Sequence, residues 1–560
     1  MRWGAHGGKC GRVVPASVSS HDKILLTDQN EAEMLNKTKG VACTVLVGAM
    51  MAAFTPSAHA AAPTNEQLLE RIEKLEELLS EKAEADKEQR QRVTLLEDKA
   101  KDVEWSFANT RPQIKTGDGR FSLAIRGRFQ VDMANFMQKD AATLAANWGC
   151  ASVTSCPSAG IRDLSSGVII RRAYFGVEGM AFKDFWYEFR MNFGGSNAES
   201  PAGDANLNLA RVAYTGIPNF RINVGVIQPV FTLGDTVSSG GVMFIERPEI
   251  DNIAVGNFGG SDSRRGVELT FQKENMFYDG TNVILSAAYT GGQTGSATGH
   301  GGCTNSTIPG GPIIPANPNS PSADCGEQAQ ILGRAAFRLW SDGTSNIQIG
   351  GSAAEILKVP PATATSLALN DRPLVRVDGR RLVSATVGSA GNPVVGGTFW
   401  GLDAGANFKN FYVAGEYHKY ILDRVTGDSP KFDGFYVEAS WVITGQPKVY
   451  NASSKGNEMG SWGPPKVNVP FSPAGGSWGV WELAVRYTDV DLDWRDDLST
   501  GIAGGEQEAI TIGLNWYLNN NVRLMLNDII MKVNRRASAG SVQRVDQKLN
   551  TVAARMQFSF

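Results

Sequence analysis

Arginines recur at alternate positions in the stretch that follows residue 120, and this spacing is the first feature of the sequence that could do chemistry. Arg126 and Arg128 alternate there with large apolar residues such as Phe129 and Val131. A guanidinium group is planar and donates hydrogen bonds in pairs, so it suits phosphates, carboxylates and other oxyanions. Several arginines on one face of a strand therefore predict a surface that attracts small anions.

The same face also carries acidic residues, so any single arginine could instead belong to a structural ion pair. Alternation along the predicted strands places these arginines on the inner face: Arg126, Arg128, Arg172, Arg190, Arg211, Arg221, Arg264, Arg334, Arg338, Arg486, Arg523 and Arg555. It places these acids beside them: Asp132, Glu178, Glu188, Glu268, Asp403, Glu416, Glu438 and Glu482. The arginines outnumber the acids, roughly twelve to eight, which favours a weakly anion-attracting wall.

The elements that carry these residues have the period of two that is typical of strands. The last segment, 549–560, alternates Val552, Met556 and Phe558 with polar or small residues and ends on Phe560. This segment alone would also fit a soluble β-sandwich. Arginines between large apolar residues are costly in a dry core but fit a barrel with water inside and lipid outside. We therefore predict an all-β transmembrane barrel of about sixteen antiparallel strands.

The expected strands after the first one are 168–180, 184–193, 207–215, 220–228, 264–273, 281–290, 330–340, 346–356, 398–408, 411–422, 433–444, 478–490, 507–518, 521–534 and 548–560. Long connections at 136–167, 291–329, 357–397 and 445–477 are expected on one side of the barrel and tight turns on the other. The stretch 372–387 could be a further strand and is interpreted as part of a long loop.

Arg171 and Arg172 are adjacent, so a regular strand would turn one of them toward lipid. That placement costs roughly 2–4 kcal/mol at the midplane of the bilayer. A bulge, a position near the membrane interface or a contact between subunits would each relieve it.

Residues 1–60 are predicted to be a presequence. Translation is expected to start at Met34, because Lys37 and Lys39 precede the short apolar stretch 41–54, and a small-residue cleavage site ends at Ala60. This arrangement is typical of a secretory signal peptide. The mature protein would begin at Ala61, with a periplasmic helix over 61–110 and the barrel over 111–560.

The stretch from Asn65 to about residue 105 has a helical pattern. Leu68, Ile72, Leu75 and Leu79 form the apolar seam of a coiled coil, and the seam is polar in its middle. A weak oligomer, such as a trimer, would use this seam, and a single solvated helix is the alternative. The charged flanks would also suit contact with peptidoglycan.

Four cysteines follow the presequence, in two local pairs within loops rich in Gly, Ser and Pro: Cys150 with Cys156, and Cys303 with Cys325. Such pairs favour disulfides formed in an oxidising compartment over free thiols. The only histidine near them is His300, so a metal site is not predicted there. Asp489, Asp491 and Asp493 share a face and could hold a divalent cation that bridges lipopolysaccharide, but they are more typical of a solvated strand end.

The bulk composition excludes several functions. The formal net charge of -3 gives no indication of a nucleic-acid partner. No mature stretch has the roughly 20 consecutive apolar residues of a membrane helix. No histidine lies at a catalytic spacing from a serine, and no phosphate-binding glycine loop joins a strand to a helix, so neither an enzyme nor a cofactor site is predicted.

Five short motifs resemble those of the phosphate-selective porins O and P in order and spacing. They are 171–179 (RRAYFGVEG), 219–231 (NFRINVGVIQPVF), Ser238-Ser239, 244–248 (FIERP) and 481–487 (WELAVRY). The resemblance covers roughly residues 115–560 and implies a trimeric sixteen-stranded channel. It also implies that about 229–263 folds into the barrel as a constriction loop.

In that family, a serine pair and the arginine of the Glu-Arg motif bind anions in the narrowest zone. The matching positions here are Ser238, Ser239 and Arg247, and Arg171, Arg172 and Tyr174 also match pore positions. Where strongly phosphate-selective members place a lysine just before the serine pair, this chain has Asp235. This difference argues against tight phosphate selectivity.

Taken with the inner-face arginines Arg126, Arg128, Arg221 and Arg486, these observations predict an outer-membrane porin for passive diffusion of small inorganic anions such as phosphate. The protein is expected to form a homotrimer that is surrounded by outer-membrane lipid and lipopolysaccharide. The alternative is a structural tether between the outer membrane and the cell wall, with little or no channel activity.

Overall fold

The computed structural model of the 560-residue chain describes residues 64–101, 103–107, 111–138, 164–195, 205–260, 263–294, 328–359, 366–389 and 391–560. The predicted presequence and the cysteines Cys150, Cys156, Cys303 and Cys325 lie outside these residues. The chain divides into two compact units, Met1–Arg92 and Val93–Phe560.

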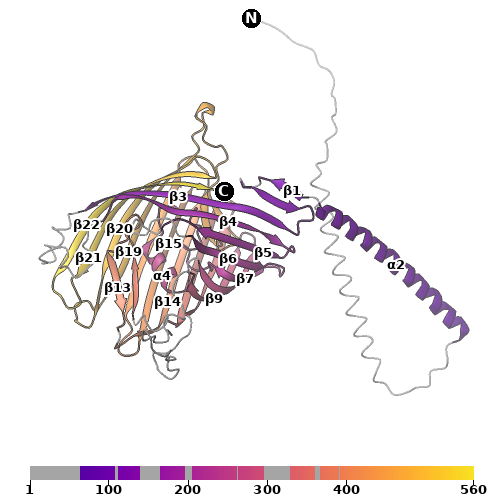
Figure 1. Ribbon diagram of the computed structural model, residues 1–560, viewed down its shortest axis with the longest axis horizontal. Helices are drawn as coiled ribbons and strands as arrows, with labels where there is room; N and C mark the ends of the chain where they lie inside the picture. The colour runs from indigo at the N-terminus through magenta and orange to yellow at the C-terminus, as the bar shows by residue number, and fades with distance from the viewer. Residues whose placement is uncertain are drawn as a thin grey trace, which may run out of the picture. The chain divides into compact units, whose positions relative to one another are not determined.

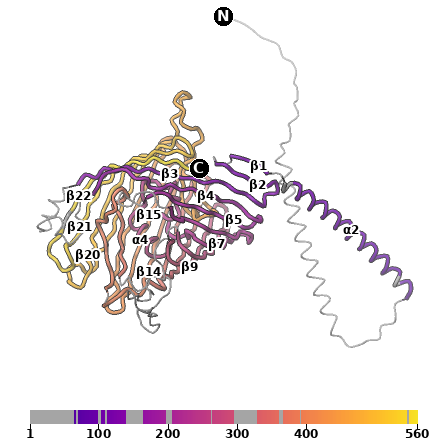
Figure 2. Tube along the Cα trace, in the orientation of Figure 1, coloured from indigo at the N-terminus to yellow at the C-terminus, as the bar shows by residue number. Residues whose placement is uncertain are grey.

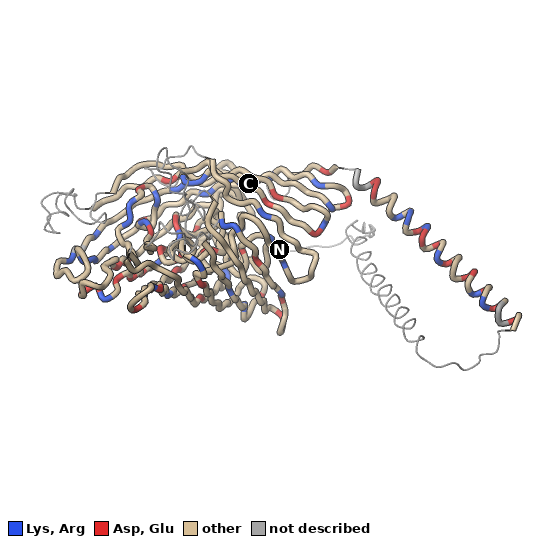
Figure 3. Tube along the Cα trace, turned by 60° about the horizontal axis from the view of Figure 1, so that its bottom comes forward, with Lys and Arg blue, Asp and Glu red and all other residues tan. Residues whose placement is uncertain are grey.

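The helix α2 (Asn65–Lys101) is the main element of the N-terminal region. Acidic and basic residues follow one another along its length (Figure 3). The apolar side chains of Ile72, Leu75 and Leu79 are 51%, 59% and 65% exposed in the single chain. An apolar seam that is open to solvent is what a helix awaiting partner helices would show. None of the helices in the described part of the chain is long and apolar enough to cross a membrane.

The second unit is built on one sheet of 18 strands. Two of them, β1 (Val103–Ser106) and β2 (Gln113–Thr116), form a hairpin, and β2 pairs with the start of β3. The other sixteen pair with their neighbours in antiparallel order, and the last pairs with the first, so the sheet closes into a barrel (Figure 1).

The barrel strands are β3 (Ser122–Gln138), β4 (Gly167–Ala181), β5 (Phe185–Asn192), β6 (Asn206–Tyr214), β7 (Phe220–Ile227), β8 (Arg264–Glu274), β9 (Asn282–Gln293), β10 (Ala329–Ser341), β11 (Asn346–Lys358), β14 (Val394–Phe408), β15 (Phe411–Arg424), β16 (Lys431–Val442), β19 (Val480–Trp494), β20 (Ile502–Tyr517), β21 (Val522–Arg536) and β22 (Arg544–Ser559). The predicted fold class, strand number and approximate strand positions are confirmed.

Alternation along each strand separates an apolar outer face from a polar inner face. On β22, Met556 and Phe558 are 51% and 42% exposed, whereas Arg555 and Gln557 are buried. Arg555 pairs across the closing seam with Asp132 of β3. A soluble barrel would bury its large apolar side chains, so the exposed apolar face is typical of a barrel that spans a membrane.

Tight connections define one end of the barrel, which we call the short-turn end; examples are 342–345 and 409–410. The long connections after β3, β9 and β11 lie at the other end, as predicted. The predicted side of 445–477 was wrong. Successive strands reverse direction, so the connection 443–479 between β16 and β19 lies at the short-turn end. It contains β17 (Lys448–Asn451), β18 (Ser461–Pro465) and the short helix η5 (Pro473–Gly475).

The interior is partly filled, in contrast to the water-filled lumen expected from the sequence. Residues 228–263, which we call the inward loop, connect β7 to β8 and carry the helix α4 (Glu249–Asn257), which lies within the ring of strands (Figure 2). Phe231 and Ile250 of this loop pack in one apolar cluster with Phe399 of the wall. The hairpin β12 (Leu367–Asp371) and β13 (Val383–Val387), within the stretch interpreted as a loop, adds Leu369 to the same cluster. Apolar side chains therefore occupy the part of the lumen away from the short-turn end.

Candidate functional site

A bulge in β4 directs both Arg171 and Arg172 into the barrel. The ladder with β3 pairs Gln130 with Arg172 and then Val131 with Ile170, so Arg171 is the extra residue. Arg171 Nε lies 2.6 Å from Glu246 Oε1, and Arg172 Nη1 donates to Gln130 Oε1 at 2.9 Å. Of the three arrangements that the sequence left open, the bulge is the one that occurs, and neither guanidinium faces lipid.

The serine pair of the inward loop lies against an arginine of β3. Arg128 donates from Nη1 to Ser239 Oγ at 2.6 Å and from Nη2 to Ser238 Oγ at 3.0 Å. No carboxylate forms an ion pair with Arg128 among the described residues. A charged guanidinium that is held only by neutral hydroxyl groups keeps its charge available to a passing anion. We call Arg128, Ser238 and Ser239 the serine site.

Tyr174 and Arg190 complete one wall of the serine site. The guanidinium carbons of Arg190 and Arg128 lie 4.7 and 5.9 Å from the centroid of the Tyr174 ring. A cavity of about 60 Å³ adjoins these groups, and its lining includes six arginines and three carboxylates. One of the carboxylates is Asp235, whose Oδ1 accepts a hydrogen bond from Gln228. The cavity thus has an excess of positive charge that Asp235 reduces.

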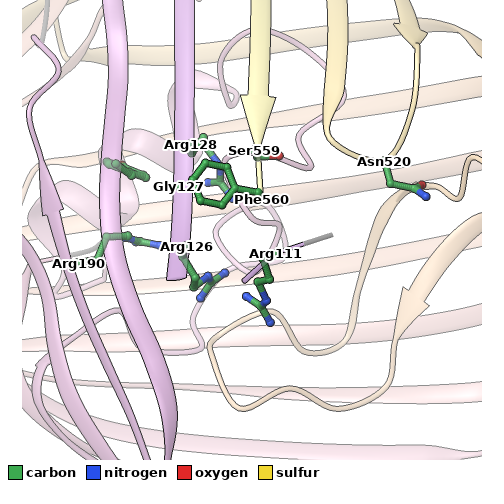
Figure 4. Close-up of a pocket in the computed structure, with 9 residues that line it drawn as sticks. Arg111, Arg126, Gly127, Arg128, Arg190, Asn520, Ser559 and Phe560 are labelled. Carbon is green, nitrogen blue, oxygen red and sulfur yellow. The ribbon is translucent and has the colours of Figure 1, made fainter. Parts of the chain in front are cut away.

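A second cavity, of about 210 Å³, lies at the short-turn end (Figure 4). Arg126, Arg128, Tyr174 and Arg190 line both cavities. The guanidiniums of Arg111 and Arg126 lie side by side, because Nη1 of each pairs with Glu178, at 2.6 and 2.8 Å. The shared residues place the two cavities next to each other, so arginines line the barrel interior both at the short-turn end and at the serine site.

A separate charged cluster surrounds Glu246 of the inward loop. Its carboxylate lies 2.6 Å from Arg171, 3.2 Å from Arg555, 3.6 Å from Arg376 and 4.0 Å from Arg172. Burial opposes ionisation of this carboxyl group, but the surrounding guanidiniums outweigh burial and hold the pKa of Glu246 well below its usual range. The cluster fastens the inward loop to β4 and β22.

Arg247 and Arg486, which the sequence also marks as site residues, donate hydrogen bonds to backbone carbonyls of the inward loop. Arg247 donates to the carbonyl oxygens of Gly234 and Val237 at 2.8 and 2.5 Å. Arg486 donates to the carbonyl of Glu246 at 3.1 Å and lies over the ring of Phe244. Both residues border a small cavity of about 30 Å³. Arg247 lines the serine-site cavity as well.

Arg221 is held by structural contacts. It pairs with Glu268 at 3.0 Å and donates to the carbonyl oxygens of Ser454 and Gly456. Those two carbonyls belong to the connection 443–479, which enters the barrel from the short-turn end. Asn457 of the same connection donates to the carbonyl of Asp235 at 3.1 Å. Arg221 therefore holds this connection against the inward loop and the wall.

The structure thus brings Arg126, Arg128, Tyr174, Ser238 and Ser239 together, with Arg171 and Arg172 at the next cluster. Arg190 was on the predicted inner face but was not selected as a site residue. Arg111 precedes the first predicted strand, and Arg376 lies in a stretch interpreted as a loop, so alternation could find neither. Asp493, one of the three aspartates considered for a cation, accepts a backbone hydrogen bond from Gly505.

A closed sixteen-stranded antiparallel barrel with an apolar outer face, a polar inner face and a loop folded into its lumen defines a porin, a channel protein of the outer membrane. The chain belongs to the family of phosphate-selective porins O and P, whose sequence model matches residues 159–560.

Comparison with individual proteins gives more distant matches. An uncharacterized protein of Caulobacter vibrioides is 28% identical over 210 residues, which are 38% of this chain and only 39% of the relative. The anion-selective porin from Comamonas acidovorans is 12% identical, with a TM-score of 0.43 over 79% of this chain and 100% of that one. OmpT of Vibrio cholerae in its trimer form is 9% identical, with a TM-score of 0.40 over 79% and 99%. The channel DcaP of Acinetobacter baumannii is 10% identical, with a TM-score of 0.39 over 80% and 99%.

Proposed function

We propose that this porin lets small inorganic anions diffuse passively across the bacterial outer membrane and binds phosphate-like oxyanions briefly at the serine site. The observation that carries the proposal is the pairing of Arg128 with two neutral hydroxyl groups, Ser238 and Ser239, next to a cavity with excess positive charge. Most other inner-face arginines contact a carboxylate or several backbone carbonyls.

The serine site has the groups that an oxyanion needs when it loses water. The guanidinium of Arg128 supplies charge and paired donors, and each serine hydroxyl can turn its hydrogen toward a bound oxygen. Passage also requires that the ion leave again. The acids Asp235 and Glu188 in the same cavity limit how tightly an anion binds. The site therefore favours transient binding, and Asp235 in place of a lysine supports modest selectivity for phosphate.

The proposal is tested by phosphate block of chloride current through single channels in planar bilayers. Arg128→Ala should raise the phosphate concentration for half block by about tenfold, the effect of losing about 1.4 kcal/mol of binding. Asp235→Asn should lower that concentration, because it removes a negative charge and keeps the oxygen that accepts from Gln228.

Lys183→Gln is the matched control. It removes one positive charge from the turn between β4 and β5, where Lys183 is exposed, and should leave the block unchanged. Equal block in the Arg128→Ala and wild-type channels, or weaker block with Asp235→Asn, would place the anion site elsewhere.

The same proposal includes the location, the assembly and the processing of the protein. We infer a homotrimer in the outer membrane, with lipid and lipopolysaccharide around the wall and an exported mature chain that starts at Ala61. Over 61–110 the helix would form a periplasmic coiled coil, and over 111–560 the barrel, with the inward loop as the constriction. The loop cysteines would form the pairs Cys150–Cys156 and Cys303–Cys325. The open apolar seam of α2 supports the coiled coil.

A structural tether is the second candidate, and the filled part of the lumen favours it. The apolar cluster of the inward loop and the β12–β13 hairpin narrows any path through the barrel. A tether would show no steady conductance steps in bilayers and would bind peptidoglycan through α2. Regular conducting steps from the purified protein would exclude it as the main role.

A further inference from the structure

Three buried groups meet where the inward loop is attached to the wall. Asp251 of α4 faces Glu416 and His418 of β15, and one ligand atom from each lies within 4.8 Å of the others. The three residues are 0%, 4% and 1% exposed. The spacing in the sequence did not single out this cluster, because Asp251 joins the two β15 residues only through the fold of the inward loop.

Hydrogen bonds around His418 determine which ring nitrogen carries a proton. The hydroxyl of Tyr420 donates to the carbonyl of Ile250 at 2.6 Å. Toward His418 Nδ1, at 3.3 Å, that hydroxyl can then only accept, so Nδ1 carries the hydrogen. His418 Nε2 makes no hydrogen bond among the described residues and lies 3.6 Å from Glu416 Oε1. In the neutral ring its lone pair is directed into the cluster, which is the state of a histidine that binds a metal.

Hydrogen bonds also orient the two carboxylates of the cluster. Asp251 Oδ1 accepts a hydrogen bond from the hydroxyl of Thr232, whereas Oδ2 has no partner within the described chain. Glu416 accepts from the backbone N–H groups of Leu233 and Gly234 at 2.7 and 2.8 Å. It also accepts from the hydroxyl of Tyr436 at 2.8 Å. Each of the three residues is thus positioned by an outer hydrogen bond, as is usual for metal ligands.

Apart from His418 itself, no basic side chain forms an ion pair with Asp251 or Glu416 among the described residues. The positive charges of Arg334 and Arg247 attract the carboxylates of Glu416 and Asp251, respectively, without direct contact. Arg334 is paired with Asp403 at 2.9 Å, and Arg247 donates to two backbone carbonyls. A divalent cation bound here would balance the charges of the two carboxylates.

We propose that Asp251, Glu416 and His418 bind one divalent transition-metal ion of the Zn²⁺ type. One imidazole nitrogen and two carboxylate oxygens are a ligand set that Zn²⁺ accepts, and a fourth position is left for water or an anion. The metal would join α4 to β15 and so fix the inward loop to the wall. This role goes beyond anion passage and does not depend on which anion the pore prefers.

The experiment uses the mature protein in detergent, without a histidine tag, after treatment with a chelator. Co²⁺ serves as the probe because its visible spectrum reports its ligands, and Zn²⁺ is then added as a competitor. The expected result is one Co²⁺ per chain, displaced by Zn²⁺, without the charge-transfer band of a cysteine ligand.

Two variants and a control make the test specific. His418→Ala and Asp251→Asn should each weaken Co²⁺ binding by more than about tenfold. His300→Ala should not change it, because His300 is not one of the three proposed ligands. Asp251→Asn keeps the shape of the side chain, so loss of Co²⁺ from a variant that still conducts chloride cannot result from unfolding.

The proposal is overturned if the wild-type protein shows no saturable Co²⁺ binding. It is also overturned if His418→Ala binds Co²⁺ as tightly as the wild type does. The first result would leave hydrogen bonds to hold this part of the loop, and the second would place the bound ion at other residues.

Discussion

At the scale of single residues, the inner arginines differ in what holds them, and this difference decides what each can do. Arg221 and Arg555 are held by carboxylates and are buried. Arg128 is held by two hydroxyl groups. Alternation in the sequence predicts that all three face inward, and they do. It cannot predict partners such as Ser238, Glu246 and Gly456, because these come from the inward loop and the connection 443–479, whose paths depend on tertiary packing.

Glu246 gives a prediction at this scale. Glu246→Gln should lower the stability of the folded barrel at pH 7 by roughly 3–5 kcal/mol, since removal of the charge leaves the buried guanidinium of Arg171 without the carboxylate with which it pairs. The pKa of Glu246 is depressed in the folded protein, so its stabilising effect is present above its ordinary pKa and is lost as the pH falls through the folded value.

The measurement is thermal unfolding in detergent between pH 8 and pH 3. The difference in Tm between the wild type and Glu246→Gln should be constant down to about pH 5 and should shrink only in more acidic solution. A difference that instead vanishes as the pH rises would show that Glu246 is not ionised in the folded loop.

At the scale of elements, the strands were predictable and the connections were not. A period of two over so many short segments leaves little freedom, because a shift of one residue would turn every polar side chain toward lipid. The end of the barrel at which 445–477 lies depends on whether an odd or an even number of barrel strands precedes it. The prediction was wrong because it used the length of the connection alone. The bulge at Arg171 was one of three possibilities, and only the observed ladder distinguishes them.

The bulge predicts the effect of a deletion. A chain with one of the two adjacent arginines removed should still fold, because Gln130–Arg172 would then be followed by Val131–Ile170 in regular register. It should lose the contact of Arg171 with Glu246 and the stability that this contact provides. Heat-modified migration on gels reports whether the barrel forms.

Deletion of Phe175 is the matched control. Phe175 lies in a regular part of the same ladder, opposite Gly127. Its removal would shift all residues of the strand before or after the deletion by one position, which turns their inner side chains outward and their outer side chains inward. This variant should therefore fail to form a barrel. Equal folding of both deletion variants would contradict the observed register.

At the scale of the whole molecule, the two units suggest separate tasks. The open seam of α2 predicts that Leu75→Asn combined with Leu79→Asn should lower the temperature at which subunits separate on mild gels. Glu73→Asn combined with Glu77→Asn changes residues off the seam and should have little effect. An unchanged separation temperature with the leucine variant would favour a single solvated helix.

The charges of the whole chain and of the groups that line the serine-site cavity have opposite signs. The formal net charge is -3, yet the serine-site cavity is lined by twice as many arginines as acids. Net charge is therefore a poor guide to the ions that a channel prefers, because ions in transit respond to the groups nearest to them. Ion preference should instead follow the lining of the narrow zone.

The most direct measurement of this account is the reversal potential of the reconstituted protein across a gradient of potassium chloride. The account predicts regular conducting steps and a reversal potential with the sign of chloride preference, reduced in magnitude by Arg128→Ala and unchanged by Lys183→Gln. A potential with the sign of potassium preference, or the absence of conductance, would contradict it.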